Sequence, residues 1–597
     1  MSTYTAPLKD MQFAIAEFAG LDSVAALPGC GDVNAELVEA ILTEAGKFAQ
    51  CVLDPLNRSG DKQGAQWRDG VVSAPDGFKD AYAQFVGAGW NGLGASTAYG
   101  GQGLPHIVAM PLQEMWNSAN MAFCLCPMLT TGVQEALMHH GSPVLLDAYM
   151  SKLVSGEWTG TMNLTEPQAG SDLSAVRTRA VPEGDHYRIH GTKIFITWGE
   201  HDMTSNIVHL LLARLPDAPE GVKGISLFVV PKFMVNADGS PGARNDIRCV
   251  SIEHKMGIHG SPTCVLAYGD GPGAVGYLVG EPNRGLEYMF TMMNHARLGV
   301  GMEGIAIAER AYQHALEYAK TRVQGRAIGQ HSGDRVTIIH HPDVRRMLMT
   351  MRAYTEGCRA MASVAAAAYD AAHHHPDADA RQQNLAVYEF MVPLVKGFST
   401  EMSLEVTSLG VQVHGGMGFI EETGAAQYYR DAKILTIYEG TTAIQANDLV
   451  GRKTARDGGQ TPKALAAQME KTEAELLKIG SDDAKAISYR LAAARSALLD
   501  VVNFIVEAAS SNPNAAYAGS VPYLMLAGNV ISGWQLARSF VAAHQALANG
   551  DSDTAFLQAK QVTARFYADH ILSKAPSVRD SIVQGADSVT AMALEAF

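Results

Sequence analysis

The stretch MNLTEPQAGSDLSAVRTRA, residues 162–180, stands where the character of the sequence changes from helical to strand-like. Upstream, apolar residues recur at helical spacing, as in AELVEAILTEAGKFAQCVLDPLN from Ala35, a helix that we expect to end at its proline. Downstream, HLLLARLP and GISLFVVP have the composition of strands closed by a proline, and HYRIHGTKIFITWG alternates around Gly191-Thr192 as a hairpin would. The sequence therefore predicts a β-rich domain between helical ones.

Helical patterns return after about residue 285 and continue to the end of the chain. One helix places Ile305, Ala308, Tyr312, Ala315, Leu316 and Ala319 on one face and Arg310, Gln313, Glu317 and Lys320 elsewhere. A second apolar stripe, after the linker-like ARDGGQTP, consists of Leu491, Leu498, Leu499, Val502, Ile505 and Val506. We expect an α+β multidomain chain with an N-terminal arm (1–34), a helical domain (35–155), a middle β domain (156–284), a helical domain (285–453) and an additional helical domain (465–597).

Length and composition limit the possible classes of protein. The 597 residues exceed what one hydrophobic core usually organises, so several domains are expected. Hydrophobic residues at 47% and charged residues at 18% are ordinary for a globular protein. The formal net charge of -15 argues against general nucleic-acid binding, although a locally basic pocket could hold an anionic ligand.

The cysteines and the first residues indicate a cytoplasmic protein. The seven cysteines are scattered and odd in number, which argues against a disulfide framework and for a reducing compartment. The start, MSTYTAPLKDMQFAIAEFAG, has no long apolar core and does not resemble a signal peptide. No stretch has the roughly twenty uninterrupted apolar residues that a membrane span needs.

Short segments around the β-rich region are candidates for a ligand site, and each also has a purely structural interpretation. Thr165 and Ser171 in the opening stretch form either a capped polar loop or part of a site. Phe195, Thr197 and Trp198 at the end of FITWG could face a flat ring and donate to its heteroatoms, or could belong to an ordinary half-buried strand.

Two segments in the second helical domain leave the same choice open. TRVQGR places Arg322 and Gln324 at a helix end, where a cation suits the helix dipole and where arginine would also fit a pyrophosphate. Gln412, Gly415 and Gly416 in QVHGGMGF form either a helix C-cap and turn or a backbone that can closely approach a ligand.

Glu439 in ILTIYEGTTAIQANDLVGRK (434–453) is a single acid after an apolar run. The local interpretation is that Thr441 or Thr442 caps the following helix, whose N-terminus favours a nearby carboxylate. Seen alone, this stretch favours that structural interpretation over a catalytic one.

Other residues with chemical potential have no supporting pattern. His373, His374 and His375 precede a proline in a polar connection and are interpreted as solvated, so no metal site is expected. Cys124 and Cys126 are interpreted as small buried residues. The chain has no H-E-x-x-H and no G-x-S-x-G motif.

Taken together, MNLTEPQAGSD, KIFITWG, YAKTRVQGR, QVHGGMGF and ILTIYEGTTAIQ resemble the acyl-CoA dehydrogenase family in order and spacing, from about residue 85 to 453. The family's fold implies an α-helical domain, a β domain and a four-helix bundle, which agrees with the patterns above. The start YTAPLKDMQFAI and the long C-terminal extension resemble the long bacterial branch, which has an N-terminal arm and an extra C-terminal helical domain.

The resemblance implies FAD-dependent α,β-dehydrogenation of an acyl-CoA thioester to the trans-2-enoyl thioester. Glu439 matches the family's catalytic base in YEGT, which reverses the local interpretation of this residue. A glutamate of ordinary pKa, about 4.3, is a weak base for a C–H bond. Enclosure among apolar groups would raise its pKa, while polarisation of the thioester carbonyl makes the α proton more acidic and the β hydrogen leaves as hydride to the flavin.

The remaining roles carry over residue by residue. Residues that match flavin-ring contacts are Met162, Leu164, Thr165, Phe195 and Thr197. Residues that match contacts to the pyrophosphate and adenosine of FAD are Arg322, Gln412, Gly415 and Gly416, and Gln324 and Thr441 are also expected to bind the cofactor. Residues expected near the substrate are Ser171, Asn294, Arg297, Tyr438 and Gly440.

The sequence departs from the family pattern at several of these positions. Phe195 replaces the usual Trp, which keeps stacking but removes an N–H donor. Gln324 and Gly325 replace a common Thr-Phe pair, Ala443 stands where Gln is frequent, and Asn294 lacks the charge of the usual Asp. The FAD and CoA contacts at these positions are therefore expected to differ in detail.

Within the long branch, the resemblance is nearest to enzymes that act on 3-methylthiopropanoyl-CoA, in the degradation of dimethylsulfoniopropionate. An electron-transfer flavoprotein is the expected acceptor, and at least a homodimer is implied because some FAD contacts come from a neighbouring subunit in the family. The alternatives are a medium- or long-chain dehydrogenase of β-oxidation, an oxygen-using acyl-CoA oxidase, and a non-catalytic CoA- or flavin-binding scaffold.

Overall fold

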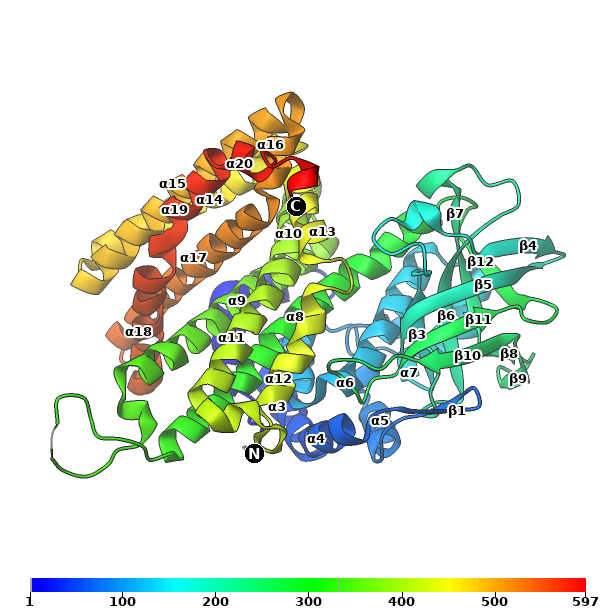
Figure 1. Ribbon diagram of the computed structural model, residues 1–597, viewed down its shortest axis with the longest axis horizontal. Helices are drawn as coiled ribbons and strands as arrows, with labels where there is room; N and C mark the ends of the chain where they lie inside the picture. The colour runs from blue at the N-terminus through cyan, green and yellow to red at the C-terminus, as the bar shows by residue number, and fades with distance from the viewer. Residues whose placement is uncertain (1–2, 331) are drawn as a thin grey trace. The chain divides into compact units, whose positions relative to one another are not determined.

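The computed structural model describes residues 3–330 and 332–597, which form two compact units (Figure 1). We call the first the helical unit; it comprises residues up to Glu44, His106–Glu114 and Val300–Phe597. We call the second the sheet unit; it comprises Ala45–Pro105 and Met115–Gly299. The β-rich region expected from the sequence lies wholly in the sheet unit.

The main sheet of the sheet unit has the strand order β10-β11-β5-β12-β7-β6-β3, and β4 pairs with both β5 and β6. Its strands are β3 (Trp158–Asn163), β4 (Arg179–Glu183), β5 (His186–Thr197), β6 (Asn206–Arg214), β7 (Ile225–Pro231), β10 (Ile247–Ile252), β11 (Thr263–Tyr268) and β12 (Ala274–Val279). Two small sheets pair β1 (Gln66–Arg68) with β2 (Val71–Ser73), and β8 (Phe233–Val235) with β9 (Pro241–Arg244). β3 runs parallel to β6, whereas β5, β7, β11 and β12 pair antiparallel.

The apolar residues of β6 and β7 explain their central place in the sheet. Both strands are almost completely buried, as expected for continuous apolar runs covered on both faces. Side chains such as Leu211, Phe228 and Val230 form the core of the unit together with residues of β5 and β11. The two proline-terminated runs are therefore strands, as the sequence predicted.

The predicted hairpin at Gly191-Thr192 is wrong, because β5 continues through both residues as one strand. A Cβ atom at Gly191 would lie 2.9 Å from the Cα atom of Thr178 and 2.3 Å from its Oγ1. A glycine is therefore needed at position 191 because the backbone at Thr178 approaches closely. Its presence does not require a turn.

The predicted helix end at Pro55 is also wrong. Helix α3 (Ala35–Phe48) passes through a π-helical turn (Ala49–Leu53) into α4 (Asp54–Gln63). Pro55 lies in the first turn of α4, where its missing N–H has no intrahelical partner to lose.

The sheet unit also contains α5 (Phe78–Gly87), α7 (Pro143–Ser155) and the part of α6 (His106–His140) from Met115 onward. Among the described residues, α6 is the one helix long and apolar enough to cross a membrane by composition. Of its most apolar window, 83% is buried inside the protein, which is the behaviour of a core helix.

The helical unit consists of an N-terminal arm, a bundle and a C-terminal set of helices. The arm contains α1 (Leu8–Phe13) and α2 (Leu21–Ala25). The bundle contains α9 (Pro342–His374), α10 (Ala378–Pro393), α11 (Ser399–His414), α12 (Ala425–Ala432), α13 (Thr442–Asp448) and α8 (Gly285–Thr321) from Val300 onward. The C-terminal helices are α14 (Gln460–Ile479), α15 (Asp482–Ser511), α16 (Pro513–Ala518), α17 (Ser520–Ala548), α18 (Thr554–His570), α19 (Ala575–Val583) and α20 (Ala586–Val589).

Helix α8 is buried on all sides from Val300 to Ala311, so the predicted division into apolar and polar faces is wrong there. Arg310 is only 2% exposed and lies over the ring of Tyr428, with its guanidinium carbon 5.4 Å from the ring centroid. A central helix of a bundle has no solvent side, and its charged residues must therefore find partners inside.

The C-terminal helices pack directly on the bundle, with α17 and α18 against α9 (Figure 1). At Gly528 of α17, a Cβ atom would lie 2.2 Å from the Phe398 ring. The expected linker ARDGGQTP is shorter than predicted, because a π-helix ends at Ala455 and α14 begins at Gln460, which leaves residues 456–459 as a turn. The chain therefore joins the additional helices to the bundle through a short turn.

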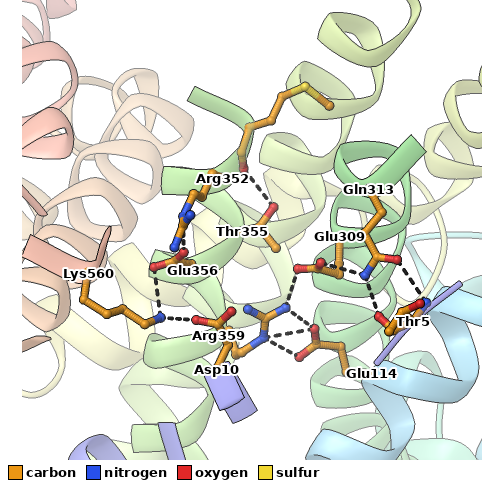
Figure 2. Close-up of polar contacts among 11 residues, drawn as sticks. Thr5, Asp10, Glu114, Glu309, Gln313, Arg352, Thr355, Glu356, Arg359 and Lys560 are labelled. Atoms are coloured by element: carbon orange, nitrogen blue, oxygen red, sulfur yellow. Dashed lines mark hydrogen bonds and ion pairs between the residues drawn. The ribbon is translucent and has the colours of Figure 1, made fainter. Parts of the chain in front are cut away.

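A buried ionic network lies within the helical unit (Figure 2). Arg359 of α9 is 4% exposed and donates to Glu114 of α6 at 2.5 Å and to Glu309 of α8 at 2.7 Å. Three helices far apart in the sequence therefore share one buried guanidinium.

The same network holds the N-terminal arm and the C-terminal helices. Lys560 of α18, 4% exposed, donates to Asp10 of the arm and, at 3.0 Å, to Glu356 of α9. Glu356 also accepts from Arg352 Nε at 2.6 Å. Lys560 thus links the N-terminal arm to α18 and α18 to α9. On α8, Gln313 Nε2 donates to the Thr5 carbonyl at 2.8 Å, and Gln313 Oε1 accepts from the Thr5 N–H at 3.1 Å.

Candidate active site

Glu439 lies in a strained turn between a 3-10 turn (Lys433–Thr436) and α13. Its φ is 53°, in the left-handed region that non-glycine residues rarely adopt, and Gly440 follows with φ 89°. Such strain persists only where the surroundings impose it, and it is concentrated at functional sites.

Hydrogen bonds hold this turn in place. Gln445 Nε2 donates to the Glu439 carbonyl at 3.2 Å, and Lys396 Nζ donates to the Gly440 carbonyl at 2.6 Å. Thr441 Oγ1 accepts from the Ile444 N–H and caps α13, as the sequence predicted. The half-buried side chain of Glu439 is therefore presented by a backbone fixed on both sides.

A second carboxyl group stands beside Glu439, and the sequence analysis missed it. Glu303 of α8 is fully buried and accepts a hydrogen bond from the Tyr438 hydroxyl. Burial is the main cause that raises the pKa of Glu303; the hydrogen bond from Tyr438 opposes the rise, the charge of Glu439 adds to it, and Lys396 opposes it. The resulting pKa is about 8. The signal in the sequence was an acid inside an otherwise apolar helical run, MEGIAIA.

In the sheet unit, the two segments predicted to contact a flavin ring meet. Thr165 follows β3, and its carbonyl accepts from the Ile194 N–H of β5 at 2.9 Å. The next residue, Phe195, has φ 59° and is 59% exposed, although it is a large aromatic side chain. Met162 and Thr197 are half-buried on the same two strands, whereas Leu164 is buried.

A buried ion pair fixes the Thr165 segment. Lys193 is fully buried and donates to the Leu164 carbonyl at 2.9 Å and to Glu166 at 2.8 Å. Burial alone would raise the pKa of Glu166, but Lys193 and the hydrogen bond from Thr178 lower it to about 2. The carboxylate therefore stays ionised and ties the segment to β5.

Trp198 does not present its ring to a ligand, which was one of the two interpretations of the end of FITWG. It is 1% exposed, and its indole N–H donates to the Ala122 carbonyl at 3.1 Å. Both residues have a left-handed backbone, but the Phe195 side chain is exposed to solvent whereas the Trp198 side chain is buried.

The residues expected near the substrate are differently exposed. Ser171 is exposed in the bend after the Thr165 segment, and Asn294 is exposed on α8. Arg297, one turn further along α8, is only 6% exposed. Tyr438 and Gly440 flank Glu439 directly and are half-buried.

The residues expected to hold the pyrophosphate end of FAD lie on an open surface of the helical unit. Arg322 and Gln324 follow α8, Gln412 lies in the last turn of α11, and all three are exposed. A Cβ atom at Gly415 or Gly416 would meet no atom within 4 Å. A ligand can therefore approach this backbone closely.

Other candidates show no site chemistry. Cys124 and Cys126 are buried, as predicted. The described part of the chain contains no cluster of His, Cys, Asp and Glu that could hold a metal ion. His373 and His374 belong to the last turn of α9, and the expected polar connection is therefore shorter than predicted.

Comparison with protein families gives matches along most of the sequence. Four family models match: "Acyl-CoA dehydrogenase, N-terminal domain" at residues 36–157, "middle domain" at 161–270, "C-terminal domain" at 283–453, and "Acetyl-CoA dehydrogenase C-terminal like" at 465–593. Together they account for most of the chain.

Individual proteins are similar over the whole length. A 3-methylmercaptopropionyl-CoA dehydrogenase of Ruegeria pomeroyi is 52% identical over 99% of this chain and 100% of its own. A broad-specificity linear acyl-CoA dehydrogenase of Mycobacterium tuberculosis is 37% identical over 98% of each chain. The crystal structure of a Bacillus anthracis acyl-CoA dehydrogenase complexed with FAD has the same fold, with a TM-score of 0.74 at 20% identity over 96% of this chain and 94% of its own.

Proposed function

The chain belongs to the acyl-CoA dehydrogenase family, and we propose that it oxidises 3-methylthiopropanoyl-CoA to the trans-2-enoyl thioester with FAD. The observation that carries the substrate is the 52% identity, over essentially both full lengths, with the Ruegeria enzyme, since 3-methylmercaptopropionyl is another name for the same acyl group. The expected fold and class of reaction, an oxidation of a CH–CH bond, are confirmed by the family.

We assign the removal of the α proton to Glu439. Its strained turn is held by Gln445 and Lys396, so the carboxylate is positioned before the substrate arrives. Tyr438 on one side and Gly440 on the other line the position of the acyl chain in this proposal. Arg297 and Ser171 are assigned to the CoA side of the thioester.

The exposed residues described above fit FAD. The open Phe195 ring with Met162, Thr165 and Thr197 suits the flavin ring. We also assign the half-buried Thr441 of the helical unit to FAD binding. Arg322 with the bare backbone at Gly415 and Gly416 suits a pyrophosphate, for which arginine has the matching donor geometry. Bound FAD supplies the acceptor for the β hydride.

The substrate assignment predicts an order of specificity. A thioether is polarizable and about as slim as a methylene chain, so one apolar slot accepts both. Since one methylene changes discrimination by only about 1–3 kcal/mol, butanoyl- and pentanoyl-CoA should also be turned over. We expect the highest kcat/KM for 3-methylthiopropanoyl-CoA when a panel of thioesters is assayed with an artificial electron acceptor.

Two outcomes of this panel would contradict the assignment. A clear preference for long chains with little turnover of the thioether would place the enzyme in general fatty-acid oxidation. Oxygen consumption equal to substrate turnover, without an added acceptor, would identify an acyl-CoA oxidase.

We propose an electron-transfer flavoprotein as the physiological acceptor, because this partnership is typical of the family.

We also propose a homodimer or higher oligomer in the cytoplasm. Beside the expected pyrophosphate residues, Met417, Phe419 and Ile420 are 43%, 86% and 41% exposed, which is unusual for large apolar side chains in one short loop. Such a loop suits a contact with a second copy of the chain. None of the cysteines that the structure describes forms a disulfide, in keeping with a reducing compartment.

The oligomer proposal makes a prediction for this loop. We expect the double variant Met417→Asp/Phe419→Asp to lose both subunit association and FAD, because burying two carboxylates in an apolar contact is strongly unfavourable. Light scattering after size exclusion and the flavin absorbance per chain measure the two effects. Leu477→Asp, which places a charge on an exposed leucine of α14, should change neither. A double variant that is monomeric but retains full FAD would contradict the proposal that this loop is needed for both subunit association and FAD binding.

A further inference from the structure

Glu303 occupies a place in α8 where the helix is tightly packed. A Cβ atom at Gly301 would lie 2.6 Å from the Val395 carbonyl oxygen, and one at Gly304 would lie 2.9 Å from that of Ser399. The glycines on either side let α8 approach the turn that carries Lys396, and Glu303 is enclosed there with 0% of its side chain exposed. No solvent is available to stabilise a charge on it.

The contacts of Glu303 do not explain its presence as a structural residue. One carboxyl oxygen accepts from the Tyr438 hydroxyl, and the other, Oε1, has no hydrogen-bond partner among the described residues. A buried polar atom without a partner lowers stability, and glutamine would keep the contact to Tyr438 without a titratable group. A residue that costs stability and yet stands beside the base suggests a functional reason.

We propose that Glu303 is a positioning residue that stays protonated beside the base, holds the ring of Tyr438, and leaves Glu439 as the ionised carboxylate of the pair. This inference rests on the proposed function of Glu439. Two carboxylates in one enclosed place cannot both ionise easily, so the burial of Glu303 keeps the negative charge on its half-exposed neighbour. The hydrogen bond to Tyr438 also fixes the residue that precedes the strained backbone of Glu439.

The arrangement has a consequence at alkaline pH. The groups that face Glu303 are the Tyr438 hydroxyl, the Glu439 carboxylate and the Lys396 ammonium, and burial is the largest influence on its pKa, which lies at about 8. Above this pH, Glu303 ionises and places a second negative charge beside the base. That charge opposes the negative charge that develops on the substrate as the α proton leaves, so the rate of dehydrogenation should fall.

The test is the pH profile of Glu303→Gln, measured as the rate at which substrate bleaches the flavin in the absence of oxygen. For the wild type, we expect the rate to fall about ten- to thirtyfold between about pH 7 and about pH 9.5, as for one ionisation near the pKa of Glu303. Relative to its own rate near neutrality, the variant should lose the alkaline fall. Superimposable profiles of the two proteins would overturn the proposal.

Tyr438→Phe provides a second, independent readout. This variant removes the hydrogen bond that lowers the pKa of Glu303, and its alkaline fall should therefore move to higher pH. An unchanged position of the fall would count against Glu303 as its origin. If the wild type is not bleached by any acyl-CoA at any pH, the proposed function itself fails, and this result is distinguishable from a failure of the Glu303 assignment.

Stability gives a readout that does not depend on activity. Because the pKa of Glu303 is raised in the folded state, only the unfolded state loses this proton between its ordinary pKa of about 4.5 and about 8. The contribution of Glu303 to stability is thus present at low pH and is lost as the pH rises through this range. We expect the melting temperature of Glu303→Gln to exceed that of the wild type at about pH 8 and the gain to shrink at about pH 5; equal differences at both values would overturn the assignment.

Discussion

Glu439→Gln is expected to bind FAD and acyl-CoA normally but to bleach the flavin with substrate about two to four orders of magnitude more slowly than the wild type, the usual range for loss of a general base. The amide has the volume of the carboxylate but cannot accept the α proton. Its backbone should keep the strained turn, because the hydrogen bonds that hold the turn come from Gln445 and Lys396 to main-chain carbonyls. Rapid mixing of oxidised enzyme with substrate in the absence of oxygen measures the rate.

A matched control separates the role of the base from a general loss of charge. Glu422→Gln removes an exposed carboxylate from the same unit and should leave the bleaching rate unchanged. The flavin absorbance per chain and substrate binding by calorimetry establish that the Glu439 variant is intact. A near-normal rate in an intact Glu439→Gln protein would mean that another residue, with Glu303 as the first candidate, removes the proton.

Arg359→Met should produce the largest loss of stability in the molecule's buried ionic network. The substitution keeps an unbranched apolar side chain of similar length but leaves Glu114 and Glu309 buried without their shared cation. Removing one partner of a buried ion pair costs about 3–5 kcal/mol, because the remaining charge has neither water nor a counter-ion. Unfolding by heat and by urea should show the loss, together with a lower yield of folded protein.

The control for this prediction is an ion pair of similar geometry on the surface. Arg248 and Asp270 are 2.7 Å apart but 61% and 54% exposed, and such pairs contribute about 0–1 kcal/mol. Arg248→Met should therefore be nearly neutral. If Arg359→Met destabilised the protein no more than Arg248→Met, the buried network would not hold the helices together. A further test is to add Glu114→Gln and Glu309→Gln to the Arg359→Met variant, which should restore part of the lost stability.

Several features could be predicted because their causes are local. The apolar runs that end at Pro216 and Pro231 identify β6 and β7, since continuous burial and a missing N–H are properties of the segments themselves. The cap at Thr441 depends on one hydroxyl and a backbone three residues away. The family and its fold could also be predicted, because five short motifs in a fixed order can be recognised from the sequence without knowledge of the structure.

The wrong predictions have two causes. Either the local sequence was compatible with two structures, or the conformation and burial of a residue depended on a segment that is distant in the sequence. Gly191 was interpreted as a turn, but a close backbone approach at Thr178 also requires glycine, and the structure has the second solution. Pro55 was expected to end a helix, although proline is equally suited to the first turn of the next one. Arg310 was expected away from the apolar face, but α8 is surrounded by other helices and has no solvent side there.

The sequence by itself determined the order of helical and strand regions, the family, and Glu439 as the candidate base, because periodicity, prolines, caps and short motifs act over a few residues. Only the tertiary structure decided which charged residues are buried and with whom. Arg359 meets Glu114 across 245 positions, and Glu303 meets Tyr438 across 135. The physical reason is that the cost of a buried charge, and therefore its pKa and its partner, depends on which distant segments exclude water around it.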